Sequence, residues 1–261
     1  MELRDSTILI TGGTSGIGLE FVKQLWQQGV ADIIITGRDL GKLENAKKQY
    51  PNVHTFQSDV SKIEDIEKLY QEVTKQFPAL NIVINNAGIM RNIDLQDITM
   101  DLENITREID VNLSGTIRMV QQFLPHLKEK DSAAIVNVSS GLAFVPFPLS
   151  PVYSAAKAGV HAYTRILRLQ LKRTKVKIFE LAPPGTNTEL MDNFEGLVDE
   201  KQNMNVDKMV SAAIHGILKN KLEIKPGVAK VLKFMSRVAP NFILNFMDKS
   251  MDKAKAKLVS L

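Results

Sequence analysis

A tyrosine and a lysine stand four residues apart in the segment 151–163, which reads PVYSAAKAGVHAY. If this segment is a helix, the phenol of Tyr153 and the ammonium of Lys157 share one face, because positions i and i+4 are neighbours. A phenol can protonate the alkoxide that forms when hydride reduces a carbonyl, but its ordinary pKa of about 10 makes it a poor base for the reverse reaction. A nearby ammonium favours the phenolate and lowers that pKa. Because the pair is short and common, it indicates redox chemistry only where a cofactor site accompanies it.

A glycine-rich turn supplies such a site near the start of the chain. The segment 11–18, TGGTSGIG, follows the apolar run 7–11 and opens a helical pattern, and it carries Gly12, Gly16 and Gly18. Glycines permit a tight turn and a close approach of the backbone to a pyrophosphate, and a helix N-terminus favours negative charge. A glycine-rich turn alone is weak evidence, but its place between a strand and a helix strengthens it. We expect a dinucleotide to bind here.

The remaining pattern says which elements position these residues. Short β-branched runs alternate with longer amphipathic stretches, which predicts a parallel sheet covered by helices on both faces. The expected fold class is α/β, a doubly wound Rossmann fold with a seven-stranded, mainly parallel sheet and a short helical C-terminal tail. Ligands bind beyond the carboxyl ends of the strands in such sheets. The expected strands are residues 7–11, 32–36, 53–57, 80–85, 133–138, 175–181 and 222–225.

We expect residues 1–225 to form a dinucleotide-binding catalytic domain and residues 226–261 a helical extension packed on the same domain. The tail pattern predicts two short amphipathic helices interrupted at Pro240. Ten Lys or Arg and three Asp or Glu lie in residues 218–261, so the other residues carry 23 − 26, or −3. Two interpretations of the tail stay open. It covers its own domain or a sister subunit, or it makes weak contact with an anionic membrane surface.

Composition excludes several classes of protein. The chain of 261 residues has no cysteine, so it has no disulfide, thiolate nucleophile or zinc-thiolate site. The four histidines are scattered, and no metal site is expected. No basic face with interleaved aromatic residues appears in the first two hundred residues, which argues against nucleic acid as a partner. Without a signal peptide pattern or a run of 18 apolar residues, the expected location is the cytoplasm.

Several further motifs occur in a fixed order. They are SDV with Asp59 and Val60, NNAG at 85–88, DVNLSG with Asn112, VNVSSG with Ser140, and YSAAK with Tyr153 and Lys157. Together with the glycine turn, they resemble the short-chain dehydrogenase/reductase family from about residue 5 to about residue 225. The interval of 13 residues between Ser140 and Tyr153 is usual in that family and selects Ser140 over Ser139. The LAPP element and the tail resemble a bacterial subgroup encoded near genes for D-alanylation of lipoteichoic acid.

The resemblance implies four catalytic residues. Tyr153 exchanges the proton, and Lys157 tunes it and also hydrogen-bonds the nicotinamide ribose. Ser140 holds the substrate oxygen, and Asn112 positions a water molecule that connects Lys157 to solvent. The alternative for Asn112 is a backbone contact that bends its helix.

The resemblance also implies a set of cofactor contacts. Asp59 accepts a hydrogen bond from the adenine amino group, and Val60 contacts adenine. The alternative for these polar strand ends is ordinary turn chemistry, in which Asn, Asp and Gly are favoured. The expected cofactor-binding residues are Gly12, Ser15, Gly16, Ile17, Gly18, Arg38, Asp59, Val60, Asn86, Ala87, Gly88, Tyr153, Lys157, Pro183 and Thr188.

The chain departs from the family after its sixth predicted strand. The family usually has a Pro-Gly pair there, whereas this chain reads LAPPGTNTEL. One alignment places Pro183 on the proline, Pro184 on the glycine, and Thr188 on the threonine that meets the nicotinamide carboxamide. A shift by one residue would place Glu189 there instead. Pro184 fixes φ and removes an N–H, so the backbone near the carboxamide is expected to differ.

Cofactor preference depends on the residues after the second strand. Sites that select NAD place an acid there for the ribose 2′-hydroxyl. Gly37 holds that place here, followed by Arg38, whose planar guanidinium suits a 2′-phosphate. Asp39 stands next to it, and Ser15 occupies the place of a second basic residue in many NADP-using relatives. We expect NADP, with use of NAD left open.

The interpretation is therefore an NAD(P)-dependent oxidoreductase that interconverts a carbonyl and an alcohol on an apolar small molecule. A nonenzymatic NADP-binding sensor or an envelope-pathway accessory protein is the alternative. A serine hydrolase is excluded because no serine stands in G-x-S-x-G. The resemblance implies a homodimer or homotetramer formed through the helices of Asn112 and Tyr153. The residues expected to flank the nicotinamide are Phe144, Phe147, Leu190, Met191 and Phe194.

Overall fold

The seven predicted strands form one sheet in the computed structural model, which describes residues 3–194, 196–198 and 203–259. All strand pairs are parallel, in the order β3-β2-β1-β4-β5-β6-β7, so the predicted fold class is confirmed. The strands are β1 (Thr7–Thr11), β2 (Asp32–Gly37), β3 (Val53–Gln57), β4 (Leu80–Asn85), β5 (Ala133–Val138), β6 (Val176–Leu181) and β7 (Glu223–Ile224).

The strand order reverses between β1 and β4. The chain moves outward on one side of β1 to β2 and β3, and on the other side to β4 and the later strands. The helices that follow these two strands leave the sheet on different sides, which opens a crevice at their carboxyl ends. The glycine turn after β1, the SDV motif after β3 and the NNAG motif after β4 therefore lie at the same edge of the sheet.

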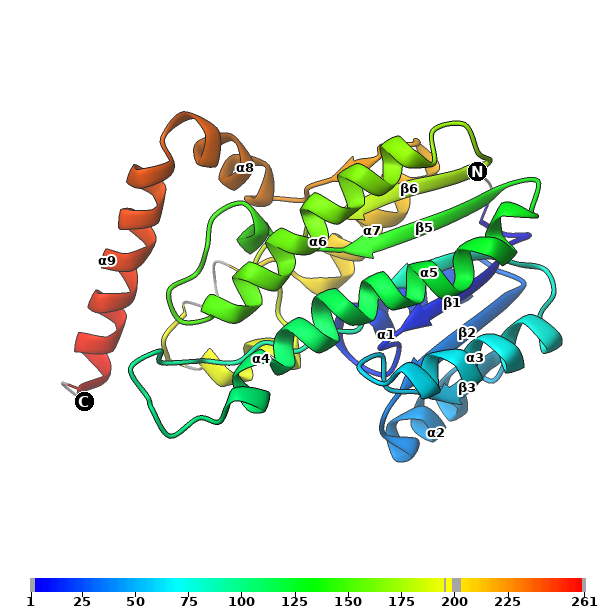
Figure 1. Cartoon of the computed structure of the whole chain (residues 1–261), viewed down its shortest axis with the longest axis horizontal. Helices are drawn as coiled ribbons and strands as arrows, with labels where there is room; N and C mark the ends of the chain where they lie inside the picture. Colours follow the sequence, from blue (N-terminus) through cyan, green and yellow to red (C-terminus); the bar gives the residue numbers. More distant parts are fainter. Residues whose placement is uncertain (1–2, 195, 199–202, 260–261) are drawn as a thin grey trace.

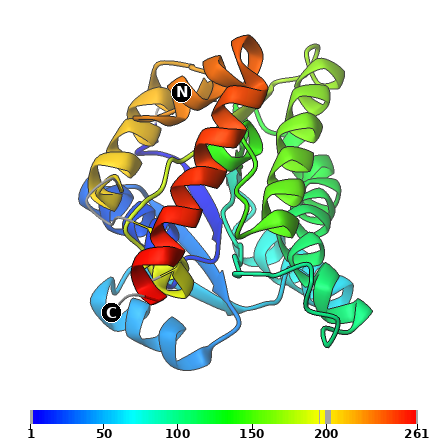
Figure 2. The same ribbon diagram turned by 90° about the vertical axis from the view of Figure 1, so that its left-hand side faces the viewer.

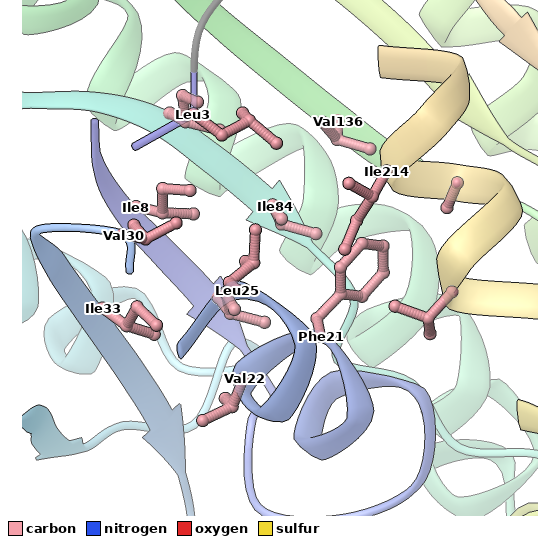
Figure 3. Packing of buried hydrophobic residues seen from close by; sticks show 14 of the residues in the cluster. Leu3, Ile8, Phe21, Val22, Leu25, Val30, Ile33, Ile84, Val136 and Ile214 are labelled. Atoms are coloured by element: carbon pink, nitrogen blue, oxygen red, sulfur yellow. The ribbon is translucent and has the colours of Figure 1, made fainter. Parts of the chain in front are cut away.

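Two layers of helices bury the sheet, and Figure 1 shows α5 and α6 on the near face with α1 and α7 behind. On one face, side chains of α1, α2 and α7 pack on the strands, including Phe21, Leu25 and Ile214 (Figure 3). Side chains of α3, α5 and α6 pack on the other face, including Phe123 and Leu167. The helices are α1 (Gly16–Gln27), α2 (Leu40–Gln49), α3 (Ile63–Gln76), α5 (Gly115–Lys128), α6 (Pro151–Gln170) and α7 (Val206–Leu218).

Burial on both faces explains why the strands read as continuous apolar runs. Ile33, Ile34 and Ile35 in β2 are almost completely buried, although their side chains alternate between the two faces. A strand with only one buried face would alternate apolar and polar residues.

A π-helical turn interrupts the long helical stretch that runs into α5. Helix α4 (Leu102–Ile109) passes directly into the π turn η1 (Asp110–Ser114), and α5 follows without a loop. Such single π turns occur frequently at functional sites. This one contains Asn112. Two short 3₁₀ helices, η2 (Gly141–Ala143) and η3 (Glu189–Phe194), follow β5 and β6.

The C-terminal extension consists of α8 (Ala229–Val238) and α9 (Pro240–Val259), which lie beyond the end of the sheet (Figure 1). Figure 2 shows α9 crossing that end of the molecule. The predicted break near Pro240 is present, but α9 has 20 residues and is not short. Proline is tolerated in the first turn of a helix because its missing N–H has no helical partner there. The last predicted tail residues, 260–261, lie outside the described residues. None of the helices within the described ranges has the length and apolarity needed to cross a membrane.

Candidate active site

Residues 12–15 form a tight glycine-containing turn between β1 and α1. Gly12 and Gly16 have φ of +65° and +50°, which side-chain-bearing residues rarely adopt. A Cβ on Gly18 would collide with the carbonyl oxygen of Gly12 and would lie 2.7 Å from Nδ2 of Asn86. The turn therefore depends on glycine for its conformation and for its close contact with α1. Ser15 lies in this turn and is the N-cap residue of α1, and Ile17 lies in the first turn of α1.

Thr11 and Asn86 join this turn to the end of β4. The Thr11 hydroxyl accepts hydrogen bonds from the backbone N–H groups of Asn86 and Ala87, both at 3.0 Å. Asn86 Nδ2 donates in return to the carbonyl oxygens of Thr11 and Gly12, at 3.0 and 3.1 Å. Thr11 was not predicted as a functional residue, because it reads as the last residue of an apolar strand. Its place directly before the glycine motif was the available signal.

Tyr153 and Lys157 lie together on the buried face of α6. Lys157 Nζ is 5.6 Å from the centre of the Tyr153 ring and donates a hydrogen bond of 2.9 Å to the carbonyl oxygen of Val138. Burial raises the pKa of Tyr153 to about 12, against the opposing effect of a hydrogen bond with Ser140. Burial lowers the pKa of Lys157 to about 8. The structure thus differs from the sequence-based expectation, since burial and not the ammonium dominates the pKa of Tyr153.

The two serines that follow β5 point in different directions. Ser140 hydrogen-bonds with Tyr153, and its hydroxyl also accepts from the Leu142 N–H at 3.1 Å. Ser139 instead donates to the buried carboxylate of Glu180 at 2.6 Å. That carboxylate also contacts His161 Nδ1 at 2.8 Å. This Ser139–Glu180–His161 group was not predicted from the sequence, although His161 follows Lys157 by one helical turn.

Asn112 in the π turn holds the segment that follows β4. Its Oδ1 accepts from the Ile89 N–H at 3.0 Å, and its Nδ2 donates to the Ile89 carbonyl oxygen at 2.8 Å. A Cβ on Gly88 would lie 2.7 Å from Asn112 Oδ1 and 3.6 Å from Lys157 Nζ, so glycine allows this close approach. This contact joins Asn112 to the backbone of another segment, so it differs from the helix-bending contact that stood as the alternative. The water-positioning role stays a prediction.

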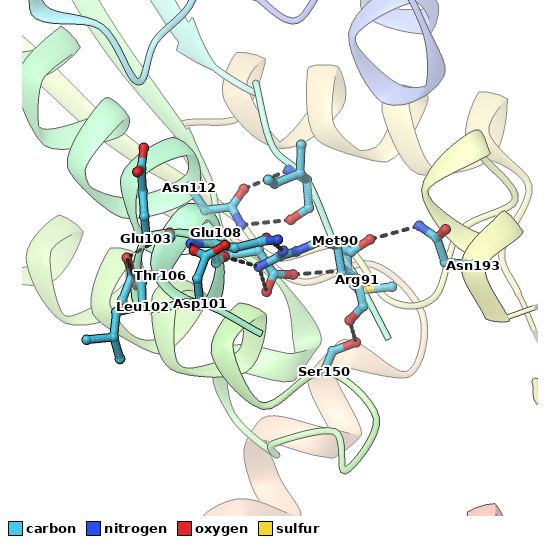
Figure 4. Close-up of polar contacts among 12 residues, drawn as sticks. Met90, Arg91, Asp101, Leu102, Glu103, Thr106, Glu108, Asn112, Ser150 and Asn193 are labelled. Carbon is cyan, nitrogen blue, oxygen red and sulfur yellow. Dashed lines mark hydrogen bonds and ion pairs between the residues drawn. The ribbon is translucent and has the colours of Figure 1, made fainter. Parts of the chain in front are cut away.

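A buried ion pair, Arg91 with Glu108, lies beside these residues (Figure 4). Glu108 is completely buried, and its carboxylate accepts from the Arg91 backbone N–H at 2.8 Å and lies 3.5 Å from the Arg91 guanidinium. The guanidinium also donates to Asn104, and the Ser150 hydroxyl donates to the Arg91 carbonyl oxygen at 2.9 Å. The pair thus connects α4 with the start of α6, which carries Tyr153.

The electrostatics of this pair extend to Tyr153. Burial raises the pKa of Glu108, against the opposing effects of the Arg91 N–H and guanidinium. The negative charge of Glu108 in turn contributes to the raised pKa of Tyr153. Sequence analysis missed both residues, although Glu108 precedes Asn112 by four residues and therefore shares its helical face.

The end of β2 presents Arg38 and Asp39 in different roles. Arg38 is exposed, and its carbonyl oxygen accepts from Gln57 Nε2 at 2.9 Å. Asp39 is the N-cap of α2, since its Oδ1 accepts from the Lys42 N–H at 3.0 Å. Asp39 therefore has a hydrogen-bond partner in the helix that it caps. Arg38 stays a predicted contact for a 2′-phosphate at this position.

Asp59 and Val60 lie where β3 ends. Asp59 Oδ1 accepts from the backbone N–H and the hydroxyl of Ser61 at 3.0 and 2.7 Å, which is the turn chemistry given as its alternative. Val60 is buried and packs against the start of α5, where a Cβ on Gly115 would lie 2.9 Å from its carbonyl oxygen.

The segment after β6 places Thr188 over the glycine turn. A Cβ on Gly16 would lie 3.3 Å from Thr188 Cβ and Cγ2. Glu189 points away to an exposed ion pair with Lys42 at 2.8 Å. Pro183 is buried, and its carbonyl oxygen accepts from the Gly141 N–H at 2.7 Å, which ties the segment to the end of β5.

An apolar cluster surrounds the tyrosine. Tyr153 packs with Met90, Phe147, Leu149 and Phe194, all buried. Phe144 was expected beside these residues, but its ring lies instead against His161, with centroids 5.0 Å apart. Partly buried residues complete the cluster: Leu142, Leu190, Met191, Leu197, Val198, Met247 and Met251. Met247 and Met251 belong to α9, so the C-terminal helix contributes to this apolar cluster.

This chain belongs to the short chain dehydrogenase family, which matches residues 6–196. It is 44% identical over 190 residues to an oxidoreductase of Bacillus subtilis named DltE, covering 73% of this chain and 75% of that protein. An oxidoreductase of Staphylococcus epidermidis is 28% identical over 232 residues, covering 86% of this chain and 99% of that protein. The family resemblance is confirmed, and the similarity to DltE fits the bacterial subgroup suggested by the LAPP element and tail.

Solved structures share the fold. A short chain dehydrogenase from Burkholderia cenocepacia in complex with NADP has a TM-score of 0.82 at 23% identity, covering 95% of this chain and 99% of that one. A 3-ketoacyl-(acyl-carrier-protein) reductase from Brucella melitensis, complexed with NADH, has a TM-score of 0.73 at 26% identity, covering 82% and 91%.

Proposed function

We propose that this chain is an NADP-preferring oxidoreductase that interconverts an apolar carbonyl compound and its alcohol. The observation that carries the proposal is the convergence of Ser140, Tyr153 and Lys157 at the carboxyl edge of the sheet, the same edge that carries the glycine turn. Ser140 hydrogen-bonds with Tyr153, and the ammonium of Lys157 lies 5.6 Å from its ring. The oxidoreductase names of the relatives support the same class of reaction.

The residues at the crevice fit a dinucleotide. Gly12 and Gly16 adopt left-handed backbone conformations, and Gly18 lets the start of α1 pack closely on Gly12, which forms a tight glycine turn at the N-terminus of α1. The exposed Arg38 offers a guanidinium at the end of β2, while Asp39 is occupied as a helix cap. These features support NADP over NAD. The bound reduced nicotinamide would supply the hydride.

The remaining chemistry is the transfer of one proton. In the reductive direction, the Tyr153 hydroxyl donates a proton to the substrate oxygen as the carbonyl carbon gains hydride, so that an alcohol forms. Ser140 donates a hydrogen bond to the same oxygen and orients it. Lys157 holds positive charge beside the phenol. The apolar cluster around Tyr153 excludes water and accommodates an apolar substrate.

Further features of the proposal concern the whole protein. Residues 1–225 carry cofactor binding and catalysis. Residues 226–261 contribute Met247 and Met251 to the apolar cluster around Tyr153, where the substrate would bind. Thr188, close to Gly16, is the better candidate for the carboxamide contact than Glu189, which pairs with Lys42. A homodimer or homotetramer and a cytoplasmic location stay predictions.

The test is Tyr153→Phe. We expect kcat for NADPH-dependent reduction of apolar aldehydes and ketones to fall by about 10²- to 10⁴-fold, the usual contribution of general acid catalysis. The dissociation constant for NADPH, measured by fluorescence titration, should stay nearly unchanged. Tyr163→Phe on the same helix is the matched control and should retain activity. If Tyr153→Phe retained more than about a tenth of kcat, the assignment would be wrong.

A further inference from the structure

The outer sides of α8 and α9 expose an unusual number of large apolar side chains. Of the 18 exposed large hydrophobic residues in the described part of the chain, seven lie within residues 228–246, so exposure is concentrated there. Scattered exposed apolar residues need no explanation, but a cluster of this kind marks an interaction surface. The residues, here called the tail surface, are Val228, Val231, Phe234, Val238, Phe242, Leu244 and Phe246.

The spacing places five of the seven tail-surface residues on one side of each helix. Val231, Phe234 and Val238 follow i, i+3 and i+7 in α8, and Phe242 and Phe246 follow i and i+4 in α9. These five side chains are 56 to 65% exposed. Their own domain does not cover them.

The opposite sides of the same helices face the protein. A Cβ on Gly141 would lie 3.1 Å from Leu232 of α8, and Lys233 forms an ion pair with Glu223 and lies 5.2 Å from the Phe144 ring centre. Met247 and Met251 of α9 pack on the apolar cluster around Tyr153. The helices are thus held in place from within, and their apolar outer sides are left for a partner.

The charges of this segment decide which partner fits. Between Lys225 and Met247 the sequence has four basic residues and no acidic residue. Lys225 and Lys233 pair with Glu223, whereas Lys230 and Arg237 are exposed beside the apolar stripe of α8. A symmetric contact with a second copy would bring the same positive charges together, which is unfavourable. An anionic partner has the complementary charge.

We propose that α8 and the first turns of α9 dock on an anionic lipid surface. Aromatic and aliphatic side chains insert at the level of the headgroups, and basic side chains at the rim contact lipid phosphates. Because α9 also borders the cluster around Tyr153, docking places the candidate active site next to the membrane surface. This surface is independent of the catalytic chemistry proposed above.

Vesicle sedimentation of the full-length protein tests the proposal. Wild-type protein should bind vesicles of phosphatidylcholine with about one-third phosphatidylglycerol, and added salt should weaken binding. Neutral phosphatidylcholine vesicles should bind little, because two short apolar stripes give only marginal affinity without the electrostatic attraction. The double change Phe234→Glu with Phe242→Glu should lower the partition coefficient at least about tenfold, since each change removes a phenylalanine and adds a negative charge.

Ile98→Glu is the matched control, because Ile98 is 96% exposed and lies outside the tail surface. It should bind vesicles like the wild type, and all variants should keep their thermal stability. The proposal is overturned if wild-type protein ignores anionic vesicles or if the double variant binds as well as wild type. It is also overturned if size-exclusion chromatography shows that the double change splits an oligomer while vesicle binding is absent, since a second copy then occupies the surface.

Discussion

Replacing Arg91 with methionine should destabilise the fold by leaving Glu108 buried without its cation. Removing one partner of a fully buried ion pair typically costs about 3–5 kcal/mol. Two features reduce that cost here, since the Arg91 side chain is 25% exposed and the backbone N–H of residue 91 continues to bind Glu108. We therefore expect a loss of about 2–3 kcal/mol in the free energy of unfolding at neutral pH. For a chain of this size, that corresponds to roughly 5–10 °C in Tm.

The pH dependence of this loss identifies its cause. Burial raises the pKa of Glu108 above its unfolded value, so the stability gained from its protonation is complete below the unfolded pKa and is lost as pH rises through the folded pKa. Without the guanidinium, the folded pKa of Glu108 rises further. Urea denaturation should therefore show a smaller loss for Arg91→Met at about pH 5 than at about pH 8.

A double-mutant cycle isolates the charge interaction. In a Glu108→Gln background, Arg91→Met should cost about 1 kcal/mol or less, because no buried carboxylate is left unpaired. Arg107→Met, which removes an exposed arginine from α4, the helix that carries Glu108, should change the free energy of unfolding by less than about 0.5 kcal/mol. An equal cost of Arg91→Met in both backgrounds, with no dependence on pH, would refute the reasoning.

Three other predictions concern the cofactor and the proton. Arg38→Leu should raise KM for NADPH about 10- to 100-fold, because a charged hydrogen bond contributes about 1.5–3 kcal/mol, and should leave KM for NADH nearly unchanged. Equal losses in steady-state assays with both cofactors would exclude a 2′-phosphate contact. Gly18→Ala should weaken NADPH binding at least about tenfold in a fluorescence titration, since its Cβ collides with Gly12 and opens the phosphate turn. Because the pKa of Tyr153 is about 12, the phenolate that alcohol oxidation needs becomes more abundant as pH rises, so oxidation should accelerate between about pH 7 and 10. Reduction should decline above about pH 8, because Lys157 has a pKa of about 8 and loses its positive charge there. A pH-independent oxidation rate would contradict the assignment of Tyr153 as the base.

The sheet was predictable because its central strands are short, largely buried apolar runs bounded by turn residues. Ile33 to Ile35 can form a strand buried on both sides, and this pattern requires helices on both faces. The length of α9 was less accessible to prediction. Its outer apolar stripe ends at Phe246, and the charged sequence beyond gives no strong helical periodicity, although the helix continues to Val259.

The buried polar groups around the site were predictable only in part. Ser140, Tyr153 and Lys157 follow from a fixed interval along one strand end and one helix. Arg91 and Glu108 pair across 17 residues that include a loop, so their contact depends on tertiary folding. Neither partner alone has a distinctive sequence context. A buried pair of this kind becomes evident only when the loop after β4 is placed against α4.

The electrostatic setting of Tyr153 also favours one direction of proton transfer. Burial and the charge of Glu108 both stabilise the protonated phenol, and the hydrogen bond with Ser140 opposes them only in part. A protonated phenol is the form that donates to a developing alkoxide, so the chain by itself prepares Tyr153 to act as an acid. Oxidation of an alcohol requires the phenolate, which a pKa of about 12 makes scarce at neutral pH. In the proposed reaction, carbonyl reduction is therefore the direction that a protonated Tyr153 assists, and it requires the reduced form of the nicotinamide cofactor.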